Sequence, residues 1–346
     1  MASPPASPDR PAAPSRVLLT GGTGFLGSHV ADALLAAGCA VRATVRPTSD
    51  TRWLDGKPVE TVTVPLAPPS GREGDDAGLD ALAAAVTGCD AVVHCAGTVG
   101  ADSEAAYRLG NVETTRRLLL AAERAGSVQR FLLVSSLAAV GPTRPGLPVD
   151  ETTPCRPVTA YGRSKLAAER LLDGRWPFRT TALRPPALYG PRDRAFLPLL
   201  RAARRGWCPL PRPLRALSLA DGRDVAAAVA ALLAAPEPAP VYGVDDGRAY
   251  GPADLAAALA AAWGRPVRLL SLPVAPLDAA ARLCPPLARR VSVLTPDRRR
   301  DLRAAAWLIS GRRLRRDTGL PPGRPLARGF RETLTFYREA GWLDAT

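Results

Sequence analysis

Long apolar runs are absent from this 346-residue chain, although 47% of its residues are hydrophobic. No stretch reaches the roughly 18 consecutive apolar residues that a membrane-spanning helix needs. The first residues also lack the apolar core of a secretory signal and the amphipathic pattern of a transit peptide. We therefore expect a globular protein without a membrane span that stays in the cytoplasm, preceded by a disordered tail over residues 1–14.

Metal-ligating side chains are equally scarce. The sequence has two histidines, His29 and His94, and its six cysteines include no C-x-x-C pair. A structural zinc site needs several such ligands at close spacing, so we expect no metal site. We expect the cysteines to be reduced thiols, because a cytosolic chain of this size does not need disulfides.

Lysine is nearly missing from a strongly basic protein. The 46 basic residues include two lysines, Lys57 and Lys165, and the formal net charge is +14. Such a charge often indicates nucleic acid, an anionic membrane or an acidic substrate as a partner. The basic runs Arg298–Arg300 and Arg312–Arg316 contain no aromatic residues that could stack on bases, and a coding bias explains the arginine excess as well as a binding surface does. We therefore predict no nucleic-acid partner.

Strand and helix patterns alternate along the first half of the chain. Short apolar strands are expected at Arg16–Thr20, Val41–Val45, Val59–Val64, Ala91–His94, Phe131–Val134 and Thr180–Leu183. Helical spacing is expected between them at Phe25–Ala37, Leu79–Val86, Glu104–Ala125 and Ala160–Leu172. This order predicts parallel β-α-β crossovers and an α/β fold, a Rossmann-type doubly wound parallel sheet over residues 15–190.

The remainder of the chain is less regular. Shorter helical patterns occur between proline-rich connections, at Ala195–Arg205, Val225–Ala234, Ala253–Trp263 and Leu326–Ala340. We predict that residues 191–346 form mainly a smaller C-terminal substrate-binding lobe, which can also return a strand and a helix to the sheet.

A glycine-rich loop joins the first strand to the first helix. Its residues are Gly21, Gly22, Thr23, Gly24, Phe25, Leu26 and Gly27, which satisfy both G-x-G-x-x-G and the wider G-x-x-G-x-x-G. Glycine permits the tight turn and lets the backbone approach a pyrophosphate at the N-terminus of a helix. The position of this loop between a strand and a helix predicts a dinucleotide site.

The loop after the second strand bears on which dinucleotide binds. An acidic residue about 20 positions beyond the glycines would accept hydrogen bonds from a ribose 2′-hydroxyl. The segment Thr44–Ser49 contains no carboxylate and offers Arg46 instead. We therefore expect NADP(H) to be preferred and NAD(H) to remain usable.

Tyr161 and Lys165 form the second chemical motif. Residues at i and i+4 share one face of a helix, so the phenol and the ammonium can point together into a site. A phenol is a weak base at neutral pH, and a nearby cation stabilises its phenolate form. Because Lys165 is one of two lysines in an arginine-rich chain, this position favours a primary amine. At the end of the fifth strand, Ser136 can donate a hydrogen bond to a substrate oxygen, whereas Ser135 is expected to satisfy backbone groups.

Five motifs occur in order between about Arg16 and Asp224: Thr20–Gly27, His94-Cys95-Ala96-Gly97, Asn111, Ser135-Ser136 and Tyr161–Lys165. Together they resemble the extended short-chain dehydrogenase/reductases, the NAD-dependent epimerase/dehydratase family. The segment Val41–Arg46 is similar to the dihydroflavonol reductase and 3β-hydroxysteroid dehydrogenase-like branch. The resemblance implies that the protein is an enzyme.

The resemblance also implies roles for individual residues. Tyr161 would be the acid/base, Lys165 would bind the nicotinamide ribose, Ser136 would orient the substrate oxygen, and Asn111 would belong to the proton relay. The implied cofactor contacts are Gly21, Thr23, Gly24, Phe25, Leu26, Gly27, Arg46, Leu66, Ala96, Gly97, Tyr161, Lys165, Pro185 and Leu188. A homodimer through the helices Glu104–Ala125 and Ala160–Leu172 is implied as well.

Two departures from the family pattern narrow the function. The acidic residue usual after the third strand is replaced by Pro65 and Leu66, so only Leu66 or the backbone can contact adenine there. Ala187 stands where nucleotide-sugar epimerases typically carry an asparagine. We expect an NAD(P)-dependent oxidoreductase that interconverts a secondary alcohol and a ketone on a small, largely apolar substrate. A nucleotide-sugar epimerase or dehydratase is the first alternative, and a non-catalytic dinucleotide-binding module is the second.

Overall fold

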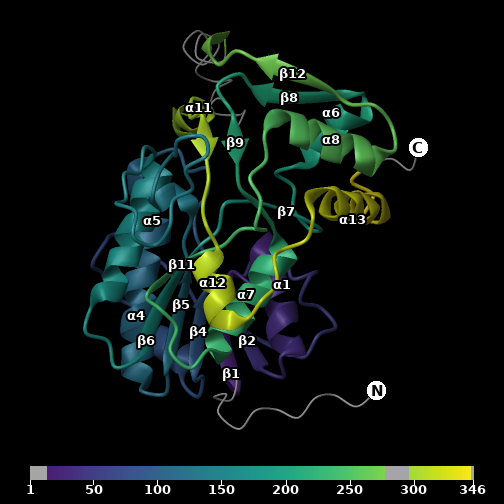
Figure 1. Cartoon of the computed structure of the whole chain (residues 1–346). Coiled ribbons are helices and arrows are strands. Elements are labelled where there is room, and N and C mark those ends of the chain that lie inside the picture. The colour runs from purple at the N-terminus through teal and green to yellow at the C-terminus, as the bar shows by residue number, and fades with distance from the viewer. Residues whose placement is uncertain (1–13, 277–295, 344–346) are drawn as a thin grey trace.

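The central layer is a seven-stranded parallel sheet with the strand order β11-β6-β5-β4-β1-β2-β3 (Figure 1). The computed structural model describes residues 14–276 and 296–343, so all but one residue of the expected N-terminal tail lies outside the described residues. The strands of the sheet are β1 Arg16–Thr20, β2 Ala40–Val45, β3 Val59–Thr63, β4 Ala91–His94, β5 Arg130–Val134, β6 Arg179–Arg184 and β11 Val241–Gly243.

Helices cover both faces of this sheet. One face carries α1 Phe25–Ala36, α7 Gly222–Ala234 and α12 Arg312–Thr318, and the other carries α2 Leu79–Val86, α4 Thr114–Ala125 and α5 Ala160–Arg170. Successive side chains of a strand point to opposite faces, so the continuous apolar run of β1 serves both layers. Leu19 packs toward the α1 layer and Leu18 toward the α4 layer, and both are fully buried. The predicted doubly wound sheet is confirmed.

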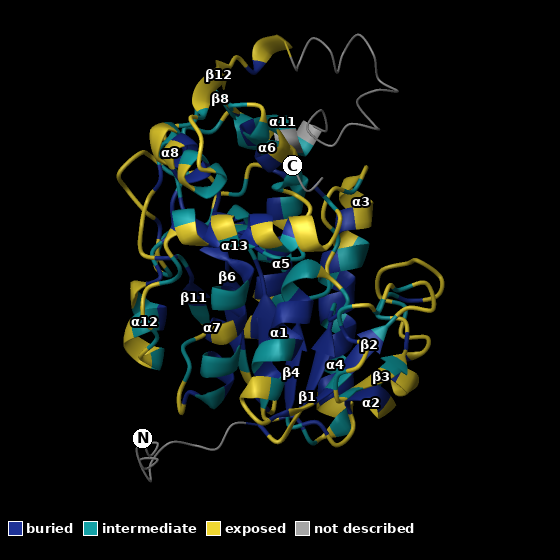
Figure 2. Cartoon of the chain, turned by 90° about the vertical axis from the view of Figure 1, so that its right-hand side faces the viewer, coloured by how far each residue is buried: buried dark blue, intermediate teal, exposed yellow. Residues whose placement is uncertain are grey.

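A second apolar core lies beyond one end of the sheet. It contains residues of α6 Leu197–Arg204, α8 Pro252–Trp263, α13 Leu326–Glu339 and β8 Trp207–Pro211. The exposed strand β12 Arg268–Leu272 pairs in parallel with β8 outside this core. Short strand pairs run between the two cores: β7 Ala187–Tyr189 with β10 Leu219–Asp221, and β9 Ala216–Leu217 with β13 Ala306–Trp307. Figure 2 shows that the central strands β1 and β4 are buried whereas β12 is exposed. Within the described residues, no helix combines the length and apolar character that crossing a membrane requires.

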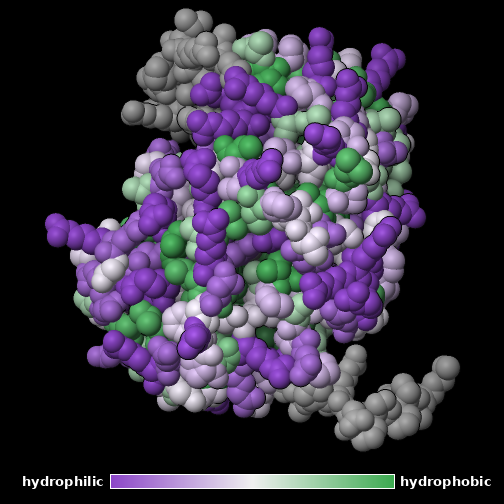
Figure 3. Space-filling view, turned by 60° about the vertical axis from the view of Figure 1, so that its left-hand side comes forward, coloured by the Kyte–Doolittle hydropathy of each residue, from purple (hydrophilic) through white to green (hydrophobic). Residues whose placement is uncertain are grey.

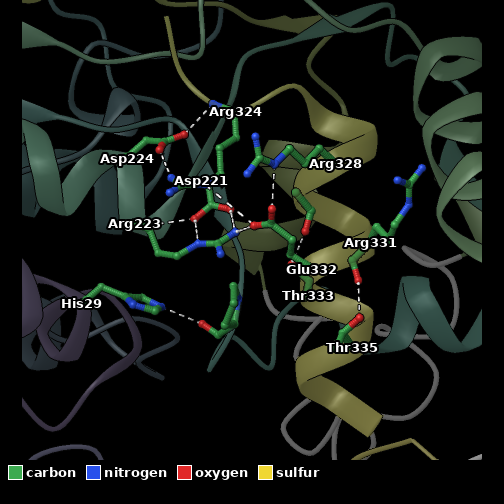
Figure 4. Close-up of polar contacts among 12 residues, drawn as sticks. His29, Asp221, Arg223, Asp224, Arg324, Arg328, Arg331, Glu332, Thr333 and Thr335 are labelled. Atoms are coloured by element: carbon green, nitrogen blue, oxygen red, sulfur yellow. Dashed lines mark hydrogen bonds and ion pairs between the residues drawn. The ribbon is translucent and has the colours of Figure 1, made fainter. Parts of the chain in front are cut away.

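A polar network ties α7 of the sheet layer to α13 of the second core (Figure 4). Arg223 contacts the fully buried carboxylate of Asp221 at 2.6 Å and Glu332 of α13 at 2.7 Å. Asp224 accepts a hydrogen bond from the backbone N–H of Arg324 at 2.6 Å. These contacts fix the second core against the sheet.

The long helix expected at Glu104–Ala125 is interrupted. It begins as α3 Glu104–Tyr107, continues as a π-helical segment over Arg108–Glu113, and resumes as α4. A Cβ on Gly110 would lie 1.9 Å from Oγ1 of Thr98, so the missing side chain lets the loop after β4 close against this segment. Such π segments frequently occur at functional sites, and this one carries Asn111.

Candidate active site

The glycine loop between β1 and α1 has the close backbone contacts that require glycine. Gly21 has a φ of +73°, a left-handed conformation, and a Cβ there would lie 2.6 Å from the backbone nitrogen of Ala96. A Cβ on Gly27 would lie 2.0 Å from the carbonyl oxygen of Gly21. These two glycines therefore hold the loop, the start of α1 and the segment after β4 together.

The N-terminus of α1 is open to a ligand. Gly24 precedes the helix, no side chain caps it, and the first turn contains no acidic residue. Gly24 is exposed, and a Cβ there would be 3.4 Å from its nearest neighbour, the carbonyl oxygen of Gly21. The free N–H groups and the positive end of the helix dipole fit the pyrophosphate of a dinucleotide.

The loops after β2 and β3 end at the same edge of the sheet as the glycine loop, because β1, β2 and β3 pair in parallel. Arg46 is exposed in a turn in which Ser49 Oγ accepts a hydrogen bond from the Arg46 N–H at 3.0 Å. The nearby Asp50 is paired with Arg52 at 2.5 Å. An exposed arginine therefore stands in the loop after β2, where the sequence predicts the contact with the adenosine ribose. Leu66 is half-buried against the α2/α4 core.

Lys165 is buried in the centre of the site. Its Nζ donates a hydrogen bond to the carbonyl oxygen of Val134 at 3.0 Å, and burial lowers the pKa of its ammonium to about 8. A Cβ on Gly97 would lie 3.2 Å from this Nζ and 2.8 Å from Oδ1 of Asn111. Glycine at position 97 therefore brings the loop after β4 into direct contact with both side chains.

Asn111 acts on the loop after β4. Its Oδ1 accepts a hydrogen bond from the Thr98 N–H at 2.7 Å, and its Nδ2 donates to the Thr98 carbonyl at 3.1 Å and to Ser164 Oγ at 2.9 Å. The side chain is 2% exposed and is not among the residues that line the cavity described next. Its contacts are those of a positioning residue for the loop and for α5.

A cavity of about 650 Å³ opens where Ser136 and Tyr161 emerge. Its wall is mostly apolar and comes from both cores, including Leu137, Pro186, Ala187, Phe196, Leu199, Leu210, Pro211, Leu214, Leu217, Leu255, Leu302 and Trp307. The charged residues in its described lining are three carboxylates, Asp102, Asp297 and Asp301, with no arginine or lysine. Figure 3 shows apolar surface among hydrophilic side chains in the centre of the face that carries α5. A cavity wall whose described residues are mostly apolar and carry only acidic charges suits a largely apolar ligand without a phosphate.

A model of the NAD dependent epimerase/dehydratase family matches residues 17–244. The chain belongs to this family. The ceramide reductase of Caulobacter vibrioides is 31% identical to it over 332 residues, which cover 94% of this chain and 96% of the relative. A 3-beta-hydroxysteroid dehydrogenase of Mycolicibacterium neoaurum is 32% identical over 191 residues, 51% of this chain and 49% of that one.

A solved structure shares the fold. The UDP-glucose 4-epimerase of Thermus thermophilus, in complex with NAD, matches with a TM-score of 0.74 and 23% identity, covering 94% of this chain and 99% of the epimerase. The family and its reductase members establish the chain as an NAD(P)-dependent oxidoreductase of the extended short-chain dehydrogenase/reductase type.

Two side chains in this family member support the site without facing the cavity. Ser135 Oγ donates to the carboxylate of Glu169, which forms a buried ion pair with Arg184 at 2.6 Å. The Ser135 hydroxyl thus binds a side chain, not the backbone groups that the sequence predicted. His94 lies 2.7 Å from Thr20 Oγ1 through its Nδ1, and Thr20 Oγ1 in turn accepts from the Ala96 N–H at 3.2 Å. Burial lowers the pKa of His94 to about 3, so its ring is neutral at physiological pH.

The segment after β6 lies against the Ser136 loop. The carbonyl oxygen of Pro185 accepts a hydrogen bond from the Leu137 N–H at 2.8 Å. Leu188 is half-buried against the α1/α7 core. Ser136 itself begins a short 3-10 turn, and its Oγ accepts a hydrogen bond from the Ala138 N–H at 3.1 Å, which fixes the hydroxyl at the cavity wall.

Asp297 is a site residue that the sequence did not reveal. Its carboxylate accepts hydrogen bonds from the backbone N–H groups of Tyr161 at 3.0 Å and Ala160 at 3.2 Å, and it lines the cavity. It comes from α11 Pro296–Leu302, 136 residues farther along the chain than Tyr161. In the sequence it directly precedes a run of arginines, and no motif marks it.

Proposed function

We propose that this protein is an NADP(H)-dependent oxidoreductase that interconverts a secondary alcohol and a ketone on a largely apolar, lipid-like substrate. The observation that carries the proposal is the cavity in which Ser136 and Tyr161 meet an apolar wall with no described arginine or lysine. The name of the ceramide reductase, which matches almost the whole chain, supports a lipid-like substrate.

Tyr161 would exchange the proton of the reacting oxygen. In the direction of reduction its phenol donates a proton to the carbonyl oxygen, and in the direction of oxidation its phenolate removes the hydroxyl proton. The nicotinamide of the cofactor, when bound, supplies or accepts the hydride. Ser136 would donate a hydrogen bond that orients the same oxygen. Lys165, one turn farther along α5, would stabilise the phenolate and bind the nicotinamide ribose.

The preference for NADP(H) follows from Arg46. An exposed guanidinium in a segment, Thr44–Ser49, that contains no carboxylate favours a 2′-phosphate, to which arginine can donate two parallel hydrogen bonds. The remaining cofactor contacts would be those that surround the glycine loop and Gly97, with Leu66, Pro185 and Leu188 at the adenine and nicotinamide ends.

The epimerase alternative requires a cavity that accepts a nucleoside diphosphate. Three carboxylates in the lining would repel a diphosphate, and its charge would lack a cationic partner among the described lining residues. Ala187, which lines the cavity, also lacks the amide that nucleotide-sugar epimerases carry at this position. The cavity therefore favours the alcohol–ketone reaction.

Turnover assays distinguish the candidate functions. Purified protein is mixed with NADPH or NADH and a panel of long-chain ketones, steroid ketones and UDP-sugars, and cofactor oxidation and sugar epimerisation are both followed. We expect NADPH oxidation with apolar ketones and no epimerisation. Epimerisation of a UDP-sugar without net cofactor oxidation would overturn the proposal. Cofactor binding without turnover on any substrate class would favour the non-catalytic module.

A further inference from the structure

The parallel pair of β8 and β12, residues 207–211 and 268–272, forms an exposed apolar ribbon on the second core (Figure 1). Of the seven large apolar side chains that are strongly exposed in the described residues, four lie on this ribbon: Trp207 at 45%, Leu269 at 40%, Leu270 at 41% and Leu272 at 41%. Figure 2 shows the exposed surface of β12 at the end of the molecule remote from β1.

The register of the ribbon separates an inner face from an outer face. Leu269 pairs with Cys208, and the two side chains share one face; Cys208 of β8 is fully buried against the second core, whereas Leu269 of β12 remains 40% exposed. Side chains alternate along strands, and neighbours in register point to the same side. Trp207, Leu270 and Leu272 therefore belong to the outer row, together with Pro209 and Pro211.

The two chain segments that contain β8 and β12 carry charged side chains of one sign. Residues 194–220 and 255–276 contain no aspartate or glutamate, although the chain has 32 acidic residues. They contain eight arginines, at positions 194, 201, 204, 205, 212, 215, 265 and 268. A coding bias can explain the abundance of arginine, but it does not explain why acidic residues are absent from these two segments. Arg205 and Arg212, both exposed, stand at the two ends of β8.

The ribbon is continuous with the substrate cavity. Leu210 and Pro211 of β8 line the cavity, and Pro211 pairs in register with the exposed Leu272. An apolar surface therefore extends from the cavity wall onto the outer face of the protein.

We propose that the outer face of the β8/β12 ribbon binds the surface of a bilayer that contains anionic phospholipid. Trp207, Leu270 and Leu272 enter the interfacial region of the bilayer. Arg205 and Arg212 at the ends of β8 pair with lipid phosphates. The apolar wall shared with the cavity then opens toward the lipid. A second copy of the chain fits this face less well, because a two-fold contact would bring two arginine-rich rims together.

Vesicle co-sedimentation tests this inference without substrate or cofactor, so its outcome is independent of the proposed reaction. The full chain is mixed with vesicles of phosphatidylcholine alone or with 30 mol% phosphatidylglycerol, at about 50 mM and about 500 mM salt. We expect binding to the anionic vesicles, at least about ten-fold weaker binding to the neutral ones, and release at high salt because the surface charges are screened. Absence of binding to anionic vesicles at low salt would overturn the proposal.

Paired variants locate the binding surface. Two double variants should each weaken binding to anionic vesicles about ten-fold. One is Leu270→Ser with Leu272→Ser, and the other is Arg205→Gln with Arg212→Gln. Arg144→Gln and Leu147→Ser, made separately and together, are the controls for loss of one charge and of one apolar side chain, since both residues are exposed and lie outside the ribbon. Equal loss in the control and ribbon variants would show that charge acts nonspecifically and would contradict the inference.

Two further measurements test whether Trp207 contacts lipid and whether the chain associates with itself. Tryptophan fluorescence should shift to the blue on anionic vesicles, and Trp207→Phe should remove most of that shift while preserving the apolar face. Analytical ultracentrifugation of wild type and the ribbon variants tests whether a second copy of the chain covers the ribbon instead. A dimer that the leucine substitutions dissociate would show that a second copy covers the ribbon.

Discussion

The carboxylate of Asp297 accepts a hydrogen bond from the backbone N–H of Tyr161 at 3.0 Å, so a residue of the C-terminal region caps the helix that carries the proposed acid/base. Thr159 caps the same helix from within, by accepting from the Gly162 N–H at 3.0 Å. The first turn of α5 is thus capped both by the residue directly before it and by a residue of α11.

Asp297→Ala should lower kcat several-fold and reduce the free energy of unfolding by about 1 kcal/mol, because two N–H groups lose their acceptor. The KM for NADPH should stay near its wild-type value, since the cap is on the cavity side of α5. Asp297→Asn keeps an acceptor oxygen and should restore most of the activity. An alanine variant with unchanged kcat and stability would show that the cap does not position Tyr161.

Tyr161→Phe should reduce turnover by about 10²- to 10⁴-fold, the usual contribution of a general acid–base group, with little change in NADPH affinity. The substitution retains the aromatic ring, whose centroid lies 5.9 Å from that of Tyr107, so folding should be preserved. Stopped-flow measurement of hydride transfer and cofactor titration check the two parts of the prediction. More than a tenth of the wild-type rate in a folded variant would remove Tyr161 from the mechanism.

The pH profile should report Lys165. Burial lowers the pKa of its ammonium to about 8, so kcat/KM should fall as the pH rises through that value and the positive charge disappears. In Lys165→Arg the charge persists, and the basic limb of the profile should move upward while cofactor binding weakens. A wild-type profile that stays flat to pH 10 would contradict this assignment.

The same titration should appear in the stability of the protein without cofactor. The folded-state pKa of Lys165 is below the value of about 10.4 expected in an unfolded chain. Between about pH 8 and 10.4 the unfolded state binds more protons, so this residue should make the free energy of unfolding rise with pH. Denaturant unfolding of wild type and Lys165→Met at pH 7 and pH 10 isolates its contribution, which the variant should lack.

Arg46→Asp should exchange the cofactor preference. Loss of the guanidinium removes charge-assisted hydrogen bonds to the 2′-phosphate, and NADPH affinity should fall about 10- to 100-fold. The new carboxylate can accept hydrogen bonds from ribose hydroxyls, so NADH should be used better than by wild type. Fluorescence titration with both cofactors measures the change, and a wild type that prefers NADH would show that this loop was misinterpreted.

Two glycines of the same loop should respond differently to substitution. Gly24→Val should fold, since Gly24 has an extended backbone and a Cβ there meets nothing closer than 3.4 Å, yet the side chain should block the pyrophosphate. Gly27→Ala should instead destabilise the fold by about 1–3 kcal/mol or more, because its Cβ would lie 2.0 Å from a carbonyl oxygen. Thermal melts and NADPH titrations separate the two effects. Tight cofactor binding by folded Gly24→Val would refute the phosphate-loop assignment.

Local patterns were enough to predict most elements of the sheet layer. The strands β1 and β4 and the helix α2 have the predicted bounds, because each is a short apolar or amphipathic pattern ended by glycine or polar residues. The prediction of one regular helix over Glu104–Ala125 was wrong in one respect. The π segment of that helix contains Gly110, which packs against Thr98, a contact between separate elements that helical periodicity does not encode.

The sequence by itself determined the sheet, the glycine loop and the Tyr161–Lys165 pair, since each depends on residues that are close in the chain and on backbone rules that hold locally. Only the tertiary structure decided the cap from Asp297, the buried environment of Lys165 and the composition of the cavity wall. These features depend on which distant side chains the fold brings together. Burial and partner geometry, which set charge and hydrogen bonding in a site, exist only once those chain segments are packed.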